Sequence, residues 1–267
     1  MIYFEYGGGL GDVINQIFRS CSYQCLETLD GMDRATIGLI CHNIHVKEIF
    51  ENHPKRDFFE AKLVPYFHGV PNETSLRIEH GINLPVNFPQ RCDLPITFYN
   101  LESDAEFVNK LAGKKYVVLL PNAGQSDRSF SQEMFQEICE FILEKTPDLN
   151  IVYIDRTYER VLRINVKYSD FDNERFYNFC DLVSVPATIN LIKASSGVIS
   201  AHSSMILPTW HYNIPNVCLF PEHIRHRHFA KGDEWSFGQN NIGSFCGTFG
   251  QESELLHGFL NHIQAYG

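Results

Sequence analysis

Three short polar segments carry the side chains best suited to chemistry, and each follows an apolar run of the sequence. The first, residues 7–12, consists of glycines and a leucine followed by Asp12; the second, residues 121–130, contains Arg128; the third is residues 202–204. Glycines let a ligand approach the backbone, a carboxylate can accept a proton, and an arginine can bind phosphate oxygens. These residue types indicate a site for a phosphorylated ligand.

Each segment also has a structural interpretation. The glycines can form a tight turn with Asp12 at a helix start, Arg128 can pair with Asp127, and Ser203 or Ser204 can cap a helix. The first segment is not a P-loop, because no Gly-Lys-Ser/Thr follows it. It also lacks the third glycine of the dinucleotide-binding fingerprint. No single segment therefore decides the function.

Alternating strands and helices must position these segments. Such alternation predicts parallel sheets with helices on both faces, which is an α/β fold. We expect strands at Ile2–Tyr6, 35–41, Tyr116–Leu120, 151–154, Gly197–Ala201 and 217–220. We expect helices at about 12–29, 101–111, from a cap at Ser131, 173–180, 187–194, 205–212 and Glu252–Tyr266.

Composition excludes several classes of protein. The chain has 267 residues with 44% hydrophobic and 20% charged residues, as in ordinary globular proteins. Its net charge of −10 argues against a broad basic face for nucleic acid. No stretch approaches 18 apolar residues and the first residues lack a signal-peptide pattern, so we expect a cytoplasmic protein without a transmembrane segment. The eight cysteines are scattered without a Cys-x-x-Cys, which favours reduced core thiols.

The order and spacing of the three segments resemble the heptosyltransferase-like glycosyltransferases of glycosyltransferase family 9. That family begins with a strand, a turn ending in Gly-Asp-Val and a long helix, as at residues 11–13 here. Its second domain opens with an apolar strand and a small-residue loop with a basic residue, matched by Tyr116–Leu120 and Arg128. A later strand and small polar turn match Gly197–Ala201 and residues 202–204. The resemblance covers most of 1–20 and 115–221.

The resemblance implies a GT-B fold, with two Rossmann-like doubly wound domains facing a cleft. The expected domains are an acceptor-side domain at 1–112, a nucleotide-sugar-binding domain at 113–251, and a last helix at 252–267 that crosses back to the first domain. The implied reaction is inverting transfer of a sugar from a nucleotide-diphosphate sugar, with no cofactor and no metal. The acceptor would be a glycan, a lipid-linked molecule or another hydroxyl compound.

The resemblance also assigns roles to residues. Asp12 would be the general base, and Arg128 would stabilise charge on the diphosphate. The family usually has Asp-Ser/Thr-Gly in its third turn, where this chain has His202, which either contacts phosphate or is structural. The expected donor-binding residues are Gly9, Gly11, Gly124, Gln125, Ser126, Arg128, His202, Ser203 and Ser204.

Other interpretations stay open. The altered third turn is compatible with a catalytically degenerate GT-B module that binds a nucleotide or glycan, and a nucleotide-sugar epimerase or hydrolase is a further alternative. Modified DNA as the acceptor is disfavoured by the acidic charge. Asp170 and Asp172 match an Asp-x-Asp metal motif but lack its strand context. The cluster of His223, His226 and His228 is interpreted as part of a surface loop that could bind an anion.

Overall fold

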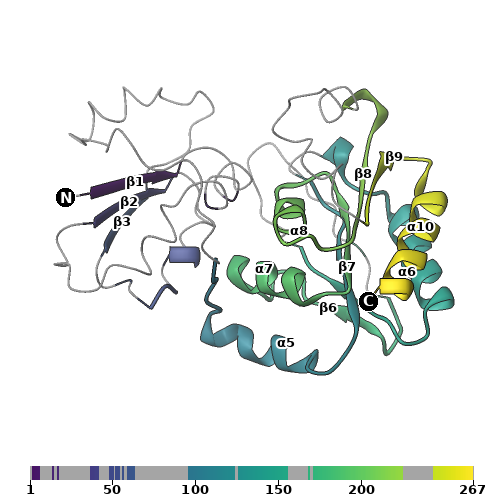
Figure 1. The fold of residues 1–267 in the computed structure, drawn as a ribbon, viewed down its shortest axis with the longest axis horizontal. Helices are drawn as coiled ribbons and strands as arrows, with labels where there is room; N and C mark the ends of the chain where they lie inside the picture. Colours follow the sequence, from purple (N-terminus) through teal and green to yellow (C-terminus); the bar gives the residue numbers. More distant parts are fainter. Residues whose placement is uncertain are drawn as a thin grey trace. The chain divides into compact units, whose positions relative to one another are not determined.

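Two parallel β-sheets form the framework of the protein, obtained as a computed structural model (Figure 1). The structure describes residues 2–6, 14, 17, 37–41, 48–50, 52–54, 56, 59–63, 96–123, 126–155, 168, 171–224 and 243–266. One sheet lies in the unit Met1–Leu101 and the other in the unit Glu102–Gly267. The division expected at residue 112, and the return of the last helix to the first domain, stay predictions.

The first unit contains three parallel strands that neighbour one another in chain order. They are β1 (Ile2–Tyr6), β2 (Ile37–Cys41) and β3 (Phe59–Leu63). Ile14 and Ile17 are helical and fully buried, as expected for the apolar face of a helix that follows β1. The first two strands confirm the sequence prediction.

The second unit contains a six-stranded parallel sheet whose strands run in the order β6-β5-β4-β7-β8-β9. Counted along the chain within this unit, the order is 3-2-1-4-5-6, which is that of a doubly wound Rossmann sheet. The predicted α/β fold class is therefore confirmed. The strands are β4 (Tyr116–Leu120), β5 (Asn150–Tyr153), β6 (Phe176–Asn178), β7 (Gly197–Ala201), β8 (Asn216–Phe220) and β9 (Ser244–Thr248).

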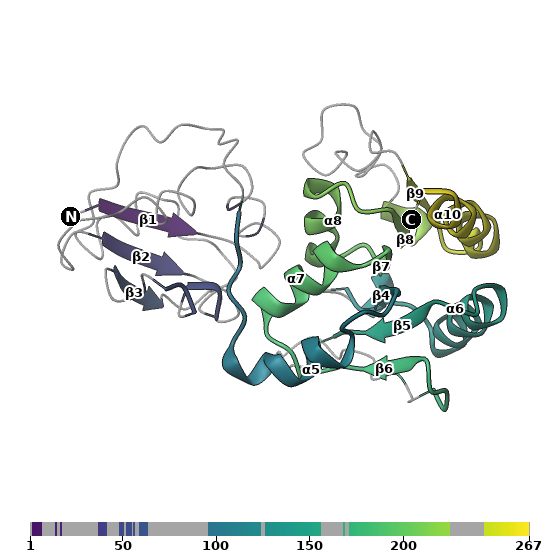
Figure 2. The same cartoon turned by 60° about the horizontal axis from the view of Figure 1, so that its bottom comes forward.

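Helices cover both faces of this second sheet (Figure 2). On one face, helices α6 and α10 pack over Val117 and Leu119 of β4. On the other face, α7 and the end of α5 pack over Val118 and Leu120. All residues of β4 are buried, because helices cover both faces of the sheet, and this explains why the sequence of this strand is an unbroken apolar run. The helices are α5 (Ala105–Lys110), α6 (Gln132–Lys145), α7 (Val185–Ala194), α8 (Leu207–His211) and α10 (Glu252–Tyr266).

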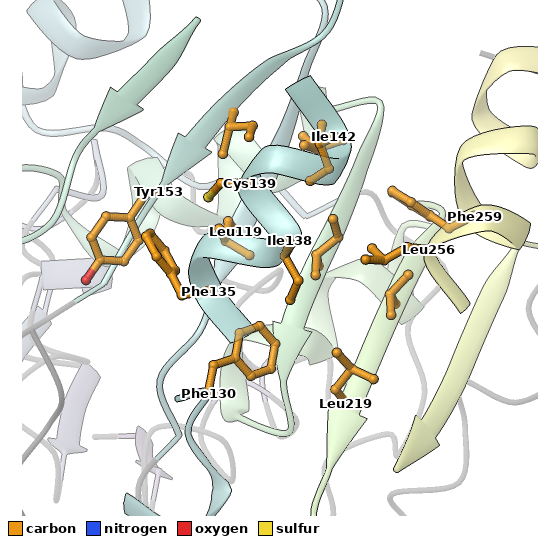
Figure 3. Close-up of a cluster of buried hydrophobic side chains, with 14 of the residues drawn as sticks. Leu119, Phe130, Phe135, Ile138, Cys139, Ile142, Tyr153, Leu219, Leu256 and Phe259 are labelled. Carbon is orange, nitrogen blue, oxygen red and sulfur yellow. The ribbon is translucent and has the colours of Figure 1, made fainter. Parts of the chain in front are cut away.

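Helix α6 forms as predicted, because its N-terminal cap and the helical spacing of its apolar residues both favour a helix here. The Ser131 hydroxyl accepts a hydrogen bond from the Met134 N–H at 3.1 Å. Phe135 and Ile138 then face the sheet within the cluster of Figure 3. The fully buried Phe135 ring stacks on Tyr168 with a centroid distance of 4.5 Å. This packing fixes the start of α6 beside the carboxyl end of β4.

Two strands depart from the sequence prediction, and both lie at the edges of the sheet. The helix predicted at 173–180 is wrong, because β6 pairs in parallel with β5 there. The apolar residues Phe176 and Phe179 are three positions apart and imitate a helical period. Strand β9 has no counterpart among the predicted strands. Edge strands have one neighbouring strand, and these two are partly exposed, so neither forms a continuous apolar run.

Arg175, which directly precedes β6, binds the carbonyl groups at the carboxyl end of α6. Its guanidinium donates to the carbonyl oxygens of Leu143 at 2.6 Å, Thr146 at 2.7 Å and Leu149 at 3.2 Å. The last carbonyls of a helix have no partner within the helix, and a cation there also complements the helix dipole. One side chain therefore ties α6, the turn after it and the edge of the sheet together.

We expect Arg175→Met to lower the free energy of unfolding by roughly 2 kcal/mol, because it removes three charged hydrogen bonds at this half-buried position and water replaces only part of them. Urea denaturation followed by circular dichroism measures the change. Lys110→Met is the matched control, since Lys110 is an exposed cation that pairs with Glu106 on its own helix. That control should stay within about 0.5 kcal/mol of the unmodified protein. An equally small change for Arg175→Met would show that the helix end does not need this side chain.

Candidate functional site

The strand order of the second unit places a candidate site at the carboxyl ends of β4 and β7. The chain leaves β4 toward one side of the sheet and β7 toward the other, so the two strands flank the topological switch point. Ligands of doubly wound sheets bind there. Residues 121–130 and 202–204, two of the three polar segments found in the sequence, directly follow these two strands. The fold therefore brings these two segments to the same edge.

The loop after β4 is closed at its base by hydrogen bonds. The Phe130 N–H donates to the Pro121 carbonyl at 2.9 Å, and the Ala123 N–H donates to the Ser129 hydroxyl at 3.1 Å. The Tyr168 hydroxyl donates to the Phe130 carbonyl at 2.8 Å. These bonds hold the short 3₁₀ turn η4 (Ser126–Arg128) before α6 begins.

Among the described helices of at least two turns, α6 has the N-terminus best suited to an anion at this edge. The free N–H groups and the dipole of a helix start attract negative charge. At α7 that place is taken by the buried Asp104 carboxylate, which accepts from the Ser184 N–H at 2.9 Å and from the Ser184 hydroxyl. At α10, Glu252 and Glu254 occupy the first turn. Helix α6 also has an acidic residue in its first turn, but it is exposed and Arg128 precedes the helix.

Arg128 is half-buried at the end of η4, with its Nε atom buried. Its neighbour Asp127 contacts a third loop: Asp127 Oδ2 lies 3.2 Å from Nε2 of His223, in the turn η6 (Glu222–Ile224) after β8. Both side chains of this pair are more than half exposed, so the pair contributes little to the stability of the fold. It does show that the two loops lie close together. The loops after β4 and β8 thus meet beside Arg128.

The turn after β7 combines one buried and one accessible polar residue. The His202 N–H donates to the Leu219 carbonyl at 3.0 Å. The residue is 7% exposed, and its imidazole ring lies edge-on to Phe220. Ser203 is half-buried, and its carbonyl accepts from the Ile206 N–H at 3.2 Å in the turn η5 (Ser204–Ile206). The turn is therefore anchored through its histidine.

Asp155 is a functional candidate that the sequence analysis missed. It follows β5, next to β4, and accepts a hydrogen bond from the Asn122 amide at the start of the loop after β4. Burial, with a contribution from Asp155, raises the pKa of Tyr168, so the phenol keeps its proton at neutral pH. An acidic residue at the end of the second strand is the usual partner of a ribose hydroxyl in Rossmann domains. Its place directly after an apolar strand is the signal that could have found it.

Several predicted residues lie outside the described part of the chain. These are Gly9, Gly11, Asp12, Gly124, Gln125, Asp170, His226 and His228, and the side chains of Ser126 and Ser204 are likewise not described. Asp172 is exposed on the loop before β6. The structure thus places Arg128, Ser203 and His202 at one edge of the second sheet. The roles expected for residues 7–12 stay predictions.

The described residues hold neither a cluster of metal ligands nor a membrane-spanning helix. No group of three or more His, Cys, Asp or Glu side chains suited to a metal ion occurs among them. No helix among the described segments is both long and apolar enough to cross a membrane. The expectation of a metal-independent reaction stays a prediction.

Comparison with known proteins supports the fold. No protein-family model and no curated protein sequence matches the chain. The solved structure of Escherichia coli ADP-heptose LPS heptosyltransferase II matches 99% of this chain and 99% of its own, with a TM-score of 0.60 and 9% identity. A glycosyl transferase of family 9 from Veillonella parvula DSM 2008 matches 95% of this chain and 87% of its own, with a TM-score of 0.57 and 11% identity. The chain therefore has the GT-B heptosyltransferase fold.

Proposed function

We propose that the protein is a glycosyltransferase that moves a sugar from a nucleotide-diphosphate sugar to an acceptor hydroxyl. The observation that carries this proposal is the position of Arg128 between β4 and the start of α6, at the switch point of a doubly wound sheet. A cation directly before a helix N-terminus suits a diphosphate. The GT-B likeness supports the same class of reaction.

The donor would bind along the carboxyl edge of the second sheet. Its diphosphate would lie between Arg128 and the first N–H groups of α6, with Gly124 allowing close approach. The Asp155 carboxylate would accept hydrogen bonds from ribose hydroxyls, and Ser203 would meet the nucleotide from the turn after β7. The loop hydrogen bonds around Pro121 fix this edge before the donor arrives, which lowers the ordering cost of binding.

We propose an inverting displacement at the anomeric carbon. The acceptor oxygen forms the new glycosidic bond while the bond from the anomeric carbon to the diphosphate oxygen breaks. Asp12 takes the proton of the acceptor hydroxyl, as the resemblance to family 9 implies. Arg128 stabilises the negative charge that develops on the leaving diphosphate, a role that a metal ion would otherwise fill.

Replacing Arg128 with alanine tests the donor site. Loss of a charged hydrogen bond to the diphosphate should weaken binding of a nucleoside diphosphate by roughly 10- to 100-fold. Titration calorimetry with ADP, UDP and GDP measures the affinity and also identifies the preferred base. Lys145→Ala is the matched control, because Lys145 is an exposed cation at the far end of α6. Equal affinities for Arg128→Ala, Lys145→Ala and the unmodified protein would remove Arg128 from the site.

One observation favours a second candidate, a nucleotide- or glycan-binding module without turnover. The family usually places an acidic residue first in the third turn, where this chain has His202, and that ring is packed against Phe220. A panel of nucleotide sugars, incubated with and without acceptors, separates the candidates. Product that requires an acceptor supports transfer, hydrolysis or isomerisation without an acceptor supports a hydrolase or epimerase, and tight binding without product supports the module.

A further inference from the structure

Two cysteine side chains lie opposite each other on neighbouring strands of the second unit. Cys218 of β8 pairs in register with Cys246 of β9. Val217 and Leu219 belong to the core under α10, and Phe245 packs against the same core. Because side chains alternate along a strand, both thiols point to the opposite face of the sheet. In Figure 2 this is the face away from α10.

The two thiols differ in their surroundings. Cys218 is 1% exposed, whereas Cys246 is only partly buried. The Ser244 hydroxyl lies 3.1 Å from Oδ1 of Asn216 and 3.9 Å from the Cys246 sulfur, so it can turn between the two. Hydrogen bonds from Cys218 and Ser244 lower the pKa of the Cys246 thiol, while the contact with Cys246 and burial raise the pKa of Cys218. Cys246 is therefore the thiol that ionises first.

We propose that Cys246 and Cys218 form an oxidation site that a hydroperoxide converts into a disulfide between β8 and β9. The Cys246 thiolate attacks one oxygen of hydrogen peroxide, the O–O bond breaks, and sulfenic acid and one water form. The Cys218 sulfur then attacks the Cys246 sulfur and displaces the second water. The two thiols lose two electrons, which reduce the peroxide.

The arrangement combines a partly buried thiol of lowered pKa, Cys246, with a fully buried partner, Cys218. Redox-sensitive cysteines are typically partly exposed, of low pKa and beside a resolving thiol. The described part of the chain supplies a matched contrast in Cys180, which is also partly buried, but burial raises its pKa to about 11. Cys139 is fully buried, and burial raises its pKa to about 12. Accessibility alone therefore does not distinguish Cys246 from Cys180.

Oxidation would act beside the proposed donor site without being part of it. The disulfide would join the strands on either side of residues 221–243, a segment that begins with the turn holding His223. His223 contacts Asp127 of the loop after β4. The proposal rests on the thiol pair itself and stands whether or not the protein transfers sugars.

Mass spectrometry of the peroxide-treated native protein tests the proposal. Trypsin releases Cys218 in peptide 194–225 and Cys246 in peptide 232–267, each as the single cysteine of its peptide. We expect these two peptides to be linked as the main disulfide after free thiols are blocked. Oxidation in guanidinium chloride is the control and should lower the linked fraction at least about tenfold, because the strands no longer hold the sulfurs together. No linked pair in the native protein, or an equal yield in guanidinium chloride, would overturn the proposal.

Variants distinguish the attacking thiol from the resolving thiol. In Cys218→Ala the sulfenic acid on Cys246 has no partner, so a dimedone probe should label peptide 232–267 at least about tenfold more than the Cys180 peptide. Cys180→Ala should keep the native disulfide yield. Equal labelling of the two cysteines would contradict the assignment of Cys246 as the attacking thiol. If Cys218→Ala does not fold, the linked peptides of the unmodified protein still decide the pairing.

Discussion

Asp12→Asn is expected to lower the rate of sugar transfer by roughly 100- to 10,000-fold, the range that a positioned general base contributes. The amide keeps the size of the carboxylate but cannot take the acceptor proton. Binding of the nucleoside diphosphate should change little, because the diphosphate is assigned to Arg128 and the start of α6. Initial rates with the preferred donor, together with calorimetric affinities, separate the two effects.

Two comparisons make this result specific. Asp172→Asn removes a carboxylate that is exposed on the loop before β6 and should leave both rate and affinity unchanged. Arg128→Ala should show the opposite pattern to Asp12→Asn, with weakened donor binding. Full activity of Asp12→Asn would reject the base assignment, while an equal loss of donor affinity and rate would assign Asp12 to donor binding instead.

The sequence predicted the interior of the second sheet well, because buried parallel strands have a local signature. Tyr116–Leu120 and Gly197–Ala201 are flanked by strands on both sides and form unbroken buried runs, and both were found at the observed bounds. Helix α10 was also predicted at its observed bounds, since its apolar residues recur with a helical period. The local pattern fails where burial is incomplete, as at β6 and β9.

The candidate site was only partly predictable, because its composition depends on which strands are neighbours. The loop after β4 and the turn after β7 each carry a local signal of small and polar residues after an apolar run. Asp155 has only its place after an apolar strand as a local signal; it becomes a candidate because β5 lies beside β4 and brings it to Asn122. Arg175 is similar, since its partners at the end of α6 lie 26 to 32 positions away in sequence.

Gly197→Ala is expected to lower the free energy of unfolding by roughly 1–3 kcal/mol, the usual range for overpacking a rigid core. A Cβ atom at Gly197 would lie 2.5 Å from Cζ of Phe259 and 3.0 Å from the Pro215 carbonyl oxygen. The Phe259 ring belongs to α10 and is fully buried in the core between that helix and the sheet. Gly258→Ala is a milder comparison, because the Phe245 ring that it meets at 2.8 Å is only partly buried and alanine favours the helix.

A double-mutant cycle with Phe259→Leu identifies the cause of this loss. Leucine removes the ring atoms that meet the new Cβ, so Gly197→Ala should cost less in that background, with a coupling energy of about 0.5–3 kcal/mol. Urea unfolding of the four proteins gives this coupling. Additive costs would assign the loss to the Pro215 carbonyl or to the backbone instead. Gly197 is the first residue of β7, whereas the turn of residues 202–204 follows the last residue of that strand. The folded variant should therefore bind the nucleoside diphosphate with unchanged affinity. Such a result would separate the stability of the sheet from the chemistry at its carboxyl edge.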